Sequence, residues 1–237
     1  MAVLSNLKID LKKFTRPKKI EIFKRFFKSG PGQYGEGDQF LGLKNAENRG
    51  IAKKYHYLSY LDLAILLKSK IHEERATAVF ILVNRFLKSD IKEKHIIFNF
   101  YLKNHAGINN WDLVDISAPK IIGGYLYLSG KSRAFLYDFA KSKNLWKRRI
   151  AIMATFYFIR EKEYEDALKI AKMLLKDKED LIHKAAGWML REIGNRDLAV
   201  EEEFLKKYYK IMPRTMLRYA IEKFPETKRQ RYLKNFI

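Results

Sequence analysis

The 237-residue sequence contains no cysteine, which excludes disulfide bonds, thiolate metal sites and a cysteine nucleophile. Its five histidines do not follow the spacing of metal ligands, so we expect no zinc site and no metal. Long apolar runs are also missing, because the longest, residues 150–159, is too short to span a bilayer. Residues 1–14 lack the apolar core of a signal peptide. We therefore expect a soluble, cytoplasmic protein without a membrane partner.

Acidic residues are few relative to basic ones. The sequence has 48 Lys and Arg against 27 Asp and Glu, which gives a formal net charge of +21. The excess is largest at the two ends, residues 1–30 and 205–237. The alternative is a lysine-rich bias of the thermophile type, but there glutamate normally rises with lysine, and here it does not. The charge therefore favours a nucleic-acid partner, bound with a strong dependence on salt.

No segment shows the sustained alternation of a strand, while apolar residues recur at helical spacing along nearly the whole chain. The sequence predicts an all-α protein. A helix that begins near Asn110 should be kinked or ended by Pro119, and Ser59 with Asp62 forms a capping box. The expected helices cover residues 3–14, 18–29, 45–56, 60–69, 72–88, 91–104, 110–128, 132–142, 145–160, 163–175, 179–193, 198–210, 213–224 and 226–235.

The sequence indicates helical hairpins that repeat with a period close to 37 residues, at Arg75, Asp112, Arg149 and Lys184. This period suits an α-solenoid, a superhelix of stacked HEAT-like hairpins whose second helices line a concave surface. Chance periodicity in an all-α chain is the alternative. We expect a single repeat domain over residues 1–237, monomeric, with a basic C-terminal helix or tail at 226–237.

The long irregular segment, residues 30–43, holds five of the twelve glycines. Glycine lets a backbone approach a ligand closely, so a phosphate-contacting loop is one interpretation. The segment lacks a Lys-Ser/Thr ending and follows no strand, which argues against a nucleotide-binding P-loop.

Three helix starts carry indoles and charges in place of ordinary surface residues. Trp111 and Asp115 are four residues apart, so they share one face of a helix, while Leu113, Val114 and Ile116 would serve the core. The other two starts contribute Arg148 and Arg149 in one helix, and a stripe of Lys184, Trp188 and Arg191 in the next.

One carboxylate between two indoles suits the departure of a cationic leaving group. A purine alkylated at N3 or N7 needs no general acid, and Asp115 could stabilise the oxocarbenium-like sugar. Indole faces attract cations, and Arg149 could hold a phosphate. Each residue also has an ordinary structural interpretation: a core tryptophan, a capping aspartate, or a solvated basic face.

These motifs carry a resemblance. NNWDLVD (109–115), LWKRRIAI (145–152) and KAAGWMLREIG (184–194), with YGEGDQFLGL (34–43) followed by Arg49, resemble the AlkD-type DNA glycosylases of the DNA alkylation repair enzyme family over residues 30–224. The resemblance implies stacked HEAT-like repeats with a basic concave face that binds double-stranded DNA. It also implies release of N3- and N7-alkylated purines without a cofactor.

The resemblance assigns roles by position. The catalytic aspartate falls on Asp115, the two site tryptophans on Trp111 and Trp188, and the site arginine on Arg149, with adjacent Arg148 as an alternative. Two other functions are consistent with an α-solenoid. A non-catalytic binder of branched or damaged nucleic acid leaves an outward carboxylate on a phosphate-binding face unexplained, and a protein-interaction scaffold predicts a more balanced charge.

Overall fold

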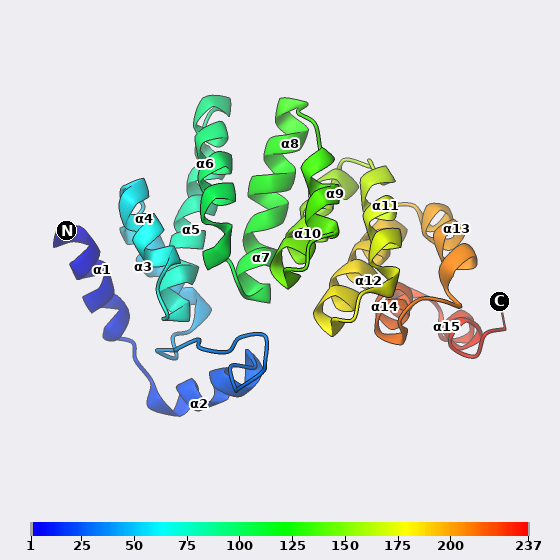
Figure 1. Ribbon diagram of the computed structural model, residues 1–237, viewed down its shortest axis with the longest axis horizontal. Coiled ribbons are helices and arrows are strands. Elements are labelled where there is room, and N and C mark those ends of the chain that lie inside the picture. Colours follow the sequence, from blue (N-terminus) through cyan, green and yellow to red (C-terminus); the bar gives the residue numbers. More distant parts are fainter. Residues whose placement is uncertain (1, 237) are drawn as a thin grey trace. The chain divides into compact units, whose positions relative to one another are not determined.

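The computed structural model describes residues 2–236, which are mostly helical (Figure 1). No strand occurs in this range; one isolated parallel bridge pairs Gln39 with Ile71. The all-α prediction is confirmed. Across the same residues, no helix is both long and apolar enough to cross a membrane.

The described chain divides into two compact units between Ile121 and Ile122. The first contains α1 (Ala2–Lys12), α2 (Pro17–Phe26), α3 (Asn45–Lys54), α4 (Tyr60–Leu67), α5 (His72–Lys88), α6 (Ile91–Asn104) and α7 (Trp111–Ser117). The second contains α8 (Gly124–Ser129), α9 (Ala134–Ala140), α10 (Leu145–Arg160), α11 (Glu165–Met173), α12 (Asp180–Gly194), α13 (Leu198–Tyr208), α14 (Arg214–Ala220) and α15 (Glu226–Leu233). A single domain over the whole chain stays a prediction.

Helix α5 is the centre of the first unit, where it packs against α3, α4, α6 and α7. Residues 72–83 are all buried, including the charged Glu73, Glu74 and Arg75. The charged side chains of a helix that is covered on all sides need partners. Lys8 of α1 is the partner of Glu74, at 2.9 Å. Successive second helices, α3, α5 and α7, are therefore neighbours, as stacked hairpins require.

Helix α12 has the same place in the second unit, between α10 and α14. Gly187 allows α14 to approach, because a Cβ at this position would lie 2.4 Å from the carbonyl oxygen of Met216. The small residue at position 187 therefore contacts a neighbouring helix. The four repeat positions at Arg75, Asp112, Arg149 and Lys184 lie on α5, α7, α10 and α12.

Local signals set several helix ends. The Ser59 hydroxyl accepts a hydrogen bond from the backbone N–H of Asp62, and the Asn110 side chain caps α7 at Trp111 N. Pro119 lies in a π-helical stretch, Ala118–Gly123, that follows α7, which confirms the predicted interruption of this helix. The C-terminal segment forms α15 and buries Tyr232 completely.

Candidate functional site

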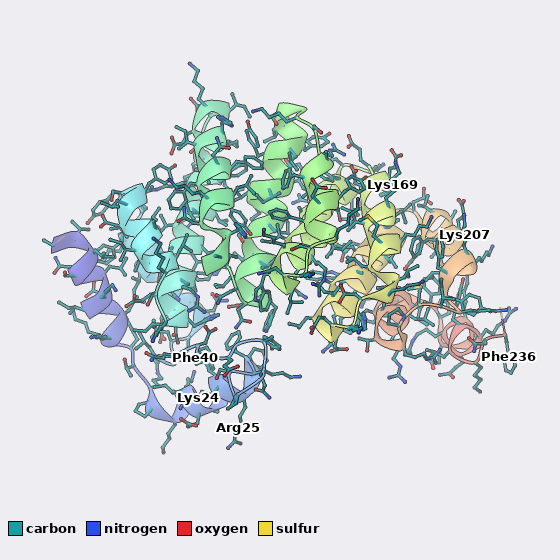
Figure 2. All side chains as sticks on the ribbon, viewed as in Figure 1. Lys24, Arg25, Phe40, Lys169, Lys207 and Phe236 are labelled. Atoms are coloured by element: carbon teal, nitrogen blue, oxygen red, sulfur yellow. The ribbon has the colours of Figure 1, made fainter. Side chains whose placement is uncertain are left out.

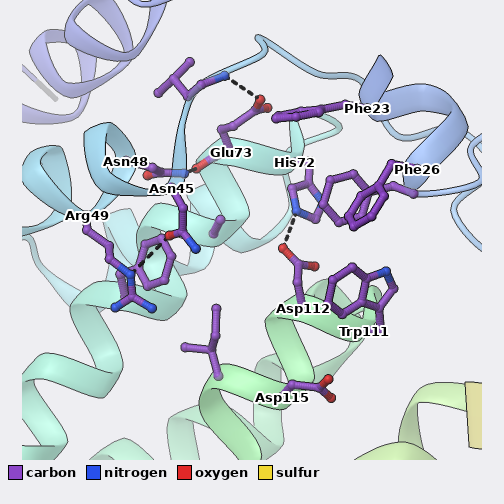
Figure 3. Close-up of a pocket in the computed structure, with 15 residues that line it drawn as sticks. Phe23, Phe26, Asn45, Asn48, Arg49, His72, Glu73, Trp111, Asp112 and Asp115 are labelled. Atoms are coloured by element: carbon purple, nitrogen blue, oxygen red, sulfur yellow. Dashed lines mark hydrogen bonds and ion pairs between the residues drawn. The ribbon is translucent and has the colours of Figure 1, made fainter. Parts of the chain in front are cut away.

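A pocket of about 400 Å³ opens between α2, α3, α5 and α7 in the first unit (Figure 3). Aromatic rings form much of its wall, and a few polar side chains from α3, α5 and α7 complete it. The lining residues are Phe23, Phe26, Phe27, Leu43, Asn45, Asn48, Arg49, His72, Glu73, Ala76, Phe80, Trp111, Asp112, Asp115 and Ile116. Trp111 and Asp115, which the sequence predicts as site residues, thus line one pocket.

The indole of Trp111 is held by two phenylalanines at the end of α2. Its ring stacks on Phe27 at 5.7 Å and meets the edge of Phe26 at 5.6 Å. Phe26 is 58% exposed, so its ring is available to a ligand. Figure 3 shows Phe26 and Trp111 side by side, with Asp115 one turn further along α7.

Three carboxylates line the pocket. Glu73 accepts hydrogen bonds from the backbone N–H groups of residues 41–43, at 2.8 to 3.3 Å. Asp112 lies 2.9 Å from the Nε2 of His72. Asp115, the third, is half-buried on α7. Ile116 is also half-buried and lines the pocket, so its predicted place in the core is wrong, because the pocket occupies that side of α7.

The partners of Glu73 argue against a phosphate-binding role for the backbone amides at the end of the glycine-rich loop, residues 41–43. The backbone amides that end this loop already bind a carboxylate of α5, and Asp38 of the same loop forms an ion pair with Arg75 at 2.7 Å. The loop is therefore part of the wall behind the pocket.

Basic side chains gather beside the pocket. The Arg49 guanidinium lies 4.2 Å from the centroid of the Phe80 ring, and its Nε donates to the Asn45 side chain at 3.1 Å. Partial burial, together with the positive charge of Arg49, lowers the pKa of Lys120. The positive charges of Arg49 and Lys120 favour the binding of an anionic ligand.

Arg49 also lines a second groove, of about 510 Å³, between α3 and α5. No carboxylate lines this groove; its residues are Arg49, Lys53, His56, Asn84, Arg85 and Lys88. The Arg85 guanidinium is fixed by the carbonyl oxygens of His56 and Leu58. The groove has the character of a phosphate-binding surface. A further set of basic residues, including Lys24 and Arg25, points outward from α2 (Figure 2).

The second unit holds the other predicted site residues, and each has an intramolecular partner. Arg148 forms an ion pair with Asp177, 2.6 Å from Nε to Oδ2, and also donates to the carbonyl oxygens of Ser142 and Lys143. Arg149 is 4% exposed and donates to the carbonyl oxygen of Leu181.

On α12 the predicted stripe is half-buried. Lys184 pairs with Asp180 at 2.7 Å, and Arg191 pairs with Glu222. The indole N–H of Trp188 donates to Glu192 at 3.2 Å, and its ring lies 6.1 Å from that of Phe156. The DNA-binding roles of these residues stay predictions.

No group of His, Asp and Glu suited to a metal ion occurs within residues 2–236.

Comparison with known proteins identifies the family. The sequence matches the family described as DNA alkylation repair enzyme over residues 7–224. The chain belongs to this family. Membership places the protein among the enzymes of DNA alkylation repair, with DNA as its partner. No curated protein matches the sequence.

Three solved structures share the fold of this DNA alkylation repair enzyme. A predicted DNA alkylation repair enzyme from Enterococcus faecalis has a TM-score of 0.69 at 17% identity, over 90% of this chain and 97% of that one. AlkD2 from Streptococcus mutans has a TM-score of 0.57 at 18% identity, over 86% and 97%. The smu.31 protein from Streptococcus mutans UA159 has a TM-score of 0.56 at 17% identity, over 90% and 98%.

The structure of this repair enzyme adds pocket residues that sequence patterns do not single out. His72 and Asp112 form the floor of the pocket, and Phe26 and Phe27 form its wall. His72 has a sequence signal, because it begins the segment HEERATA (72–78) that contains the repeat position Arg75. Its contact with Asp112, however, joins residues 40 positions apart. The phenylalanines belong to an ordinary amphipathic helix end, which gives no sign of a site.

Proposed function

We propose that the chain is a DNA glycosylase that removes positively charged N3- and N7-alkylated purines from DNA by hydrolysing the N-glycosidic bond, which initiates base excision repair. The observation that carries the proposal is that Trp111 and Asp115 line one aromatic-walled pocket in a DNA alkylation repair enzyme. The family match supports a role in DNA alkylation repair, and the rings and the carboxylate of the pocket support the proposed reaction.

The leaving group is the reason that one carboxylate is enough. An alkylated purine already carries the positive charge that a general acid would otherwise provide, so its bond to the sugar is weak. As that bond breaks, positive charge develops on the sugar, and Asp115 stabilises it or orients the attacking water. Asp115 lines the pocket on the same helix as Trp111, which favours it for this role.

The aromatic wall supports recognition of the charge. Trp111 and the exposed Phe26 present π faces, which attract cations by about 0.5–2 kcal/mol each. Trp188 stays a proposed contact for the damaged base. A neutral base gains none of this attraction, so the wall favours the damaged base over the normal one.

The cations beside the pocket are proposed to hold the DNA backbone. Arg49 and the groove between α3 and α5 lie next to the pocket, and the groove contains no carboxylate. Arg148, Arg149, Lys184 and Arg191 are proposed as further contacts with the DNA backbone.

The decisive test is incubation of the purified protein with a duplex that contains a single 7-methylguanine. We expect abasic sites to form at the lesion, with and without a chelator, and no abasic sites in an undamaged duplex. Strand cleavage by alkali after the reaction measures these sites. A complete lack of release at micromolar enzyme would overturn the proposal.

The alternative is a non-catalytic protein that binds branched or damaged DNA. It is favoured by one observation, that the groove between α3 and α5 is lined by basic side chains and no carboxylate, which suits binding of a phosphate backbone without any reacting group. The two functions differ in the same assay. The alternative predicts tight binding to a four-way junction or a lesion duplex without any base release.

A further inference from the structure

The floor of the pocket is a buried network of charged groups around His72. This residue begins α5, and its side chain is 5% exposed. Its Nε2 lies 2.9 Å from Oδ2 of Asp112, and its Nδ1 lies 3.6 Å from Oδ2 of Asp38. Arg75 pairs with the other oxygen of Asp38 at 2.7 Å, and the Asn110 amide donates to Asp38 at 3.2 Å.

Three segments that are distant in the sequence meet at this imidazole. Asp38 belongs to the glycine-rich loop, His72 and Arg75 belong to α5, and Asp112 belongs to the first turn of α7. Figure 3 shows His72 and Asp112 facing each other across the pocket floor. The interaction with Asp112 thus connects α5 to the helix that carries the candidate catalytic residue.

The charges balance only when the imidazole is protonated. Asp38 and Asp112 contribute two negative charges, and Arg75, whose guanidinium also lies 3.4 Å from the imidazole Nδ1, contributes one positive charge, so a neutral His72 leaves one of these two carboxylates without a cation. Burial opposes the imidazolium most strongly, but Asp112 and Asp38 together outweigh it and raise the pKa of His72 to about 9. The same contacts lower the pKa of Asp38 against the effect of its own burial.

A ring stack provides a second connection from His72 to α7. The ring of Phe27 lies between the imidazole, at 4.6 Å, and the indole of Trp111, at 5.7 Å. The first turn of α7 is therefore fixed on two sides, by the ion pair at Asp112 and by the stack at Trp111. Asp115 follows one turn later on the same helix.

We propose that His72 is a positioning residue for this site: its imidazolium holds the first turn of α7, and with it Trp111 and Asp115, in the arrangement that acts on the substrate. The consequence for base release rests on the proposed function. The consequence for the position of Trp111 does not, and each can be measured separately.

The first measurement is the fluorescence of Trp111 between pH 6 and pH 11, in a full-length protein with Trp146→Phe and Trp188→Phe. We expect a transition near pH 9, as His72 loses its proton and releases α7. The charged groups that face His72 and contribute to this transition are Asp112, Asp38 and Arg75. Circular dichroism at each pH verifies that the helices remain folded.

Three variants assign the transition. Asp112→Asn retains an acceptor but not the charge, so the midpoint should move at least about one unit toward acid, as a lost neighbouring carboxylate predicts. His72→Asn should remove the transition. His95→Asn, on α6, is the matched control and should leave it unchanged. If His72→Asn does not fold, the wild-type and Asp112→Asn curves are sufficient for the test.

The second measurement is the single-turnover rate of base release from a 7-methylguanine duplex at saturating enzyme. His72→Asn should lower this rate at least about tenfold at pH 7, as expected for a misplaced reacting group, with DNA affinity unchanged. The wild-type rate should fall with the same midpoint as the fluorescence.

The outcomes separate the two proposals. No release by the wild type at any pH contradicts the proposed function, while the Trp111 transition still tests the positioning role. A flat Trp111 signal, or one that His72→Asn leaves unchanged, overturns the positioning role even if base release is robust.

Discussion

The carboxyl group of Glu201 on α13 lies against the backbone of Gly194, the last residue of α12. A Cβ at position 194 would be 1.6 Å from the Oε2 of Glu201. Glu201 is 1% exposed, and its Oε1 has no hydrogen-bond partner within the described residues. Glycine at position 194 therefore provides the space that this buried carboxyl group occupies.

This contact predicts a pH-dependent stability. Burial, with the negative charge of Glu202, raises the pKa of Glu201 to about 8 from an ordinary value of 4.5. The native state thus holds a proton that the unfolded chain releases, so the stabilisation is complete below pH 4.5 and is lost as the pH rises through 8.

Glu201→Gln cannot ionise and should remove that loss. We expect its free energy of unfolding to exceed that of the wild type by about 1 kcal/mol or more at pH 9 and to be similar at pH 5. Urea denaturation at pH 5, 7 and 9 measures the difference. Glu203→Gln, an exposed position on the same helix, is the control, and parallel curves for Glu201→Gln and wild type would contradict the prediction.

Asp115→Asn should lose most base release while it keeps the fold and the affinity for DNA. Removal of a charge that stabilises the transition state costs a few kcal/mol, or about a hundredfold or more in rate. Single-turnover release from 7-methylguanine DNA measures the loss, and Asp138→Asn, an exposed aspartate on α9, is the matched control. Near-normal release by Asp115→Asn would move the catalytic role to another residue.

Trp111→Ala and Trp188→Ala should each weaken release by about tenfold, which corresponds to 1–2 kcal/mol of cation–π and stacking contact. Trp146→Ala, on α10, removes an indole that we assign no contact with the base, and it should behave like the wild type. Release that is insensitive to both substitutions, with folding intact, would show that the indoles serve only the core.

Selectivity should follow the charge of the lesion. Duplexes with cationic 7-methylguanine or 3-methyladenine should lose the base, and duplexes with neutral hypoxanthine or uracil should not, because release of a neutral base requires a proton donor. The same assay measures both kinds of substrate. Efficient release of hypoxanthine would mean that a general acid operates in the site.

Binding to DNA should weaken steeply with salt. Lys53→Gln with Lys88→Gln removes two cations from the groove between α3 and α5, and should reduce the slope of log affinity against log salt by about two. Lys169→Gln with Lys207→Gln, two exposed lysines of the second unit (Figure 2), is the control. Equal slopes for the two double variants would exclude the groove from the DNA contact.

Local patterns predicted the helices well, because each depends on residues close together in the sequence. The ranges of α5, α6 and α10 coincide with the predicted ones, since the apolar spacing lies within these segments and the capping residues Asp90 and Asn144 directly precede α6 and α10. Motif spacing likewise singled out Trp111 and Asp115. The periodicity could not foresee the π-helical stretch around Pro119, because a period of 3.6 residues contains no information on a locally wider turn.

The surroundings of the site were not predictable in the same way. The Asp38–His72–Asp112 network joins residues 34 and 40 positions apart, and neither distance follows from a helical period. The partners of Arg148 and Arg191 in the second unit are also remote, at Asp177 and Glu222. Sequence patterns indicate which residues share a helix face, whereas the partners of a buried charge depend on which helices pack together.

The Glu73 carboxylate also explains how this protein can meet the phosphates of DNA. Consecutive backbone N–H groups that converge on one oxygen anion form the kind of concavity that binds phosphate in many proteins. Here the backbone N–H groups of residues 41–43 donate to the Glu73 carboxylate of the same chain. This carboxylate takes the place of a phosphate, and its covalent connection to the chain gives it a high effective concentration. A nucleic-acid phosphate cannot compete for that position. Contacts with the DNA backbone are therefore expected from basic side chains, in keeping with the net charge of +21.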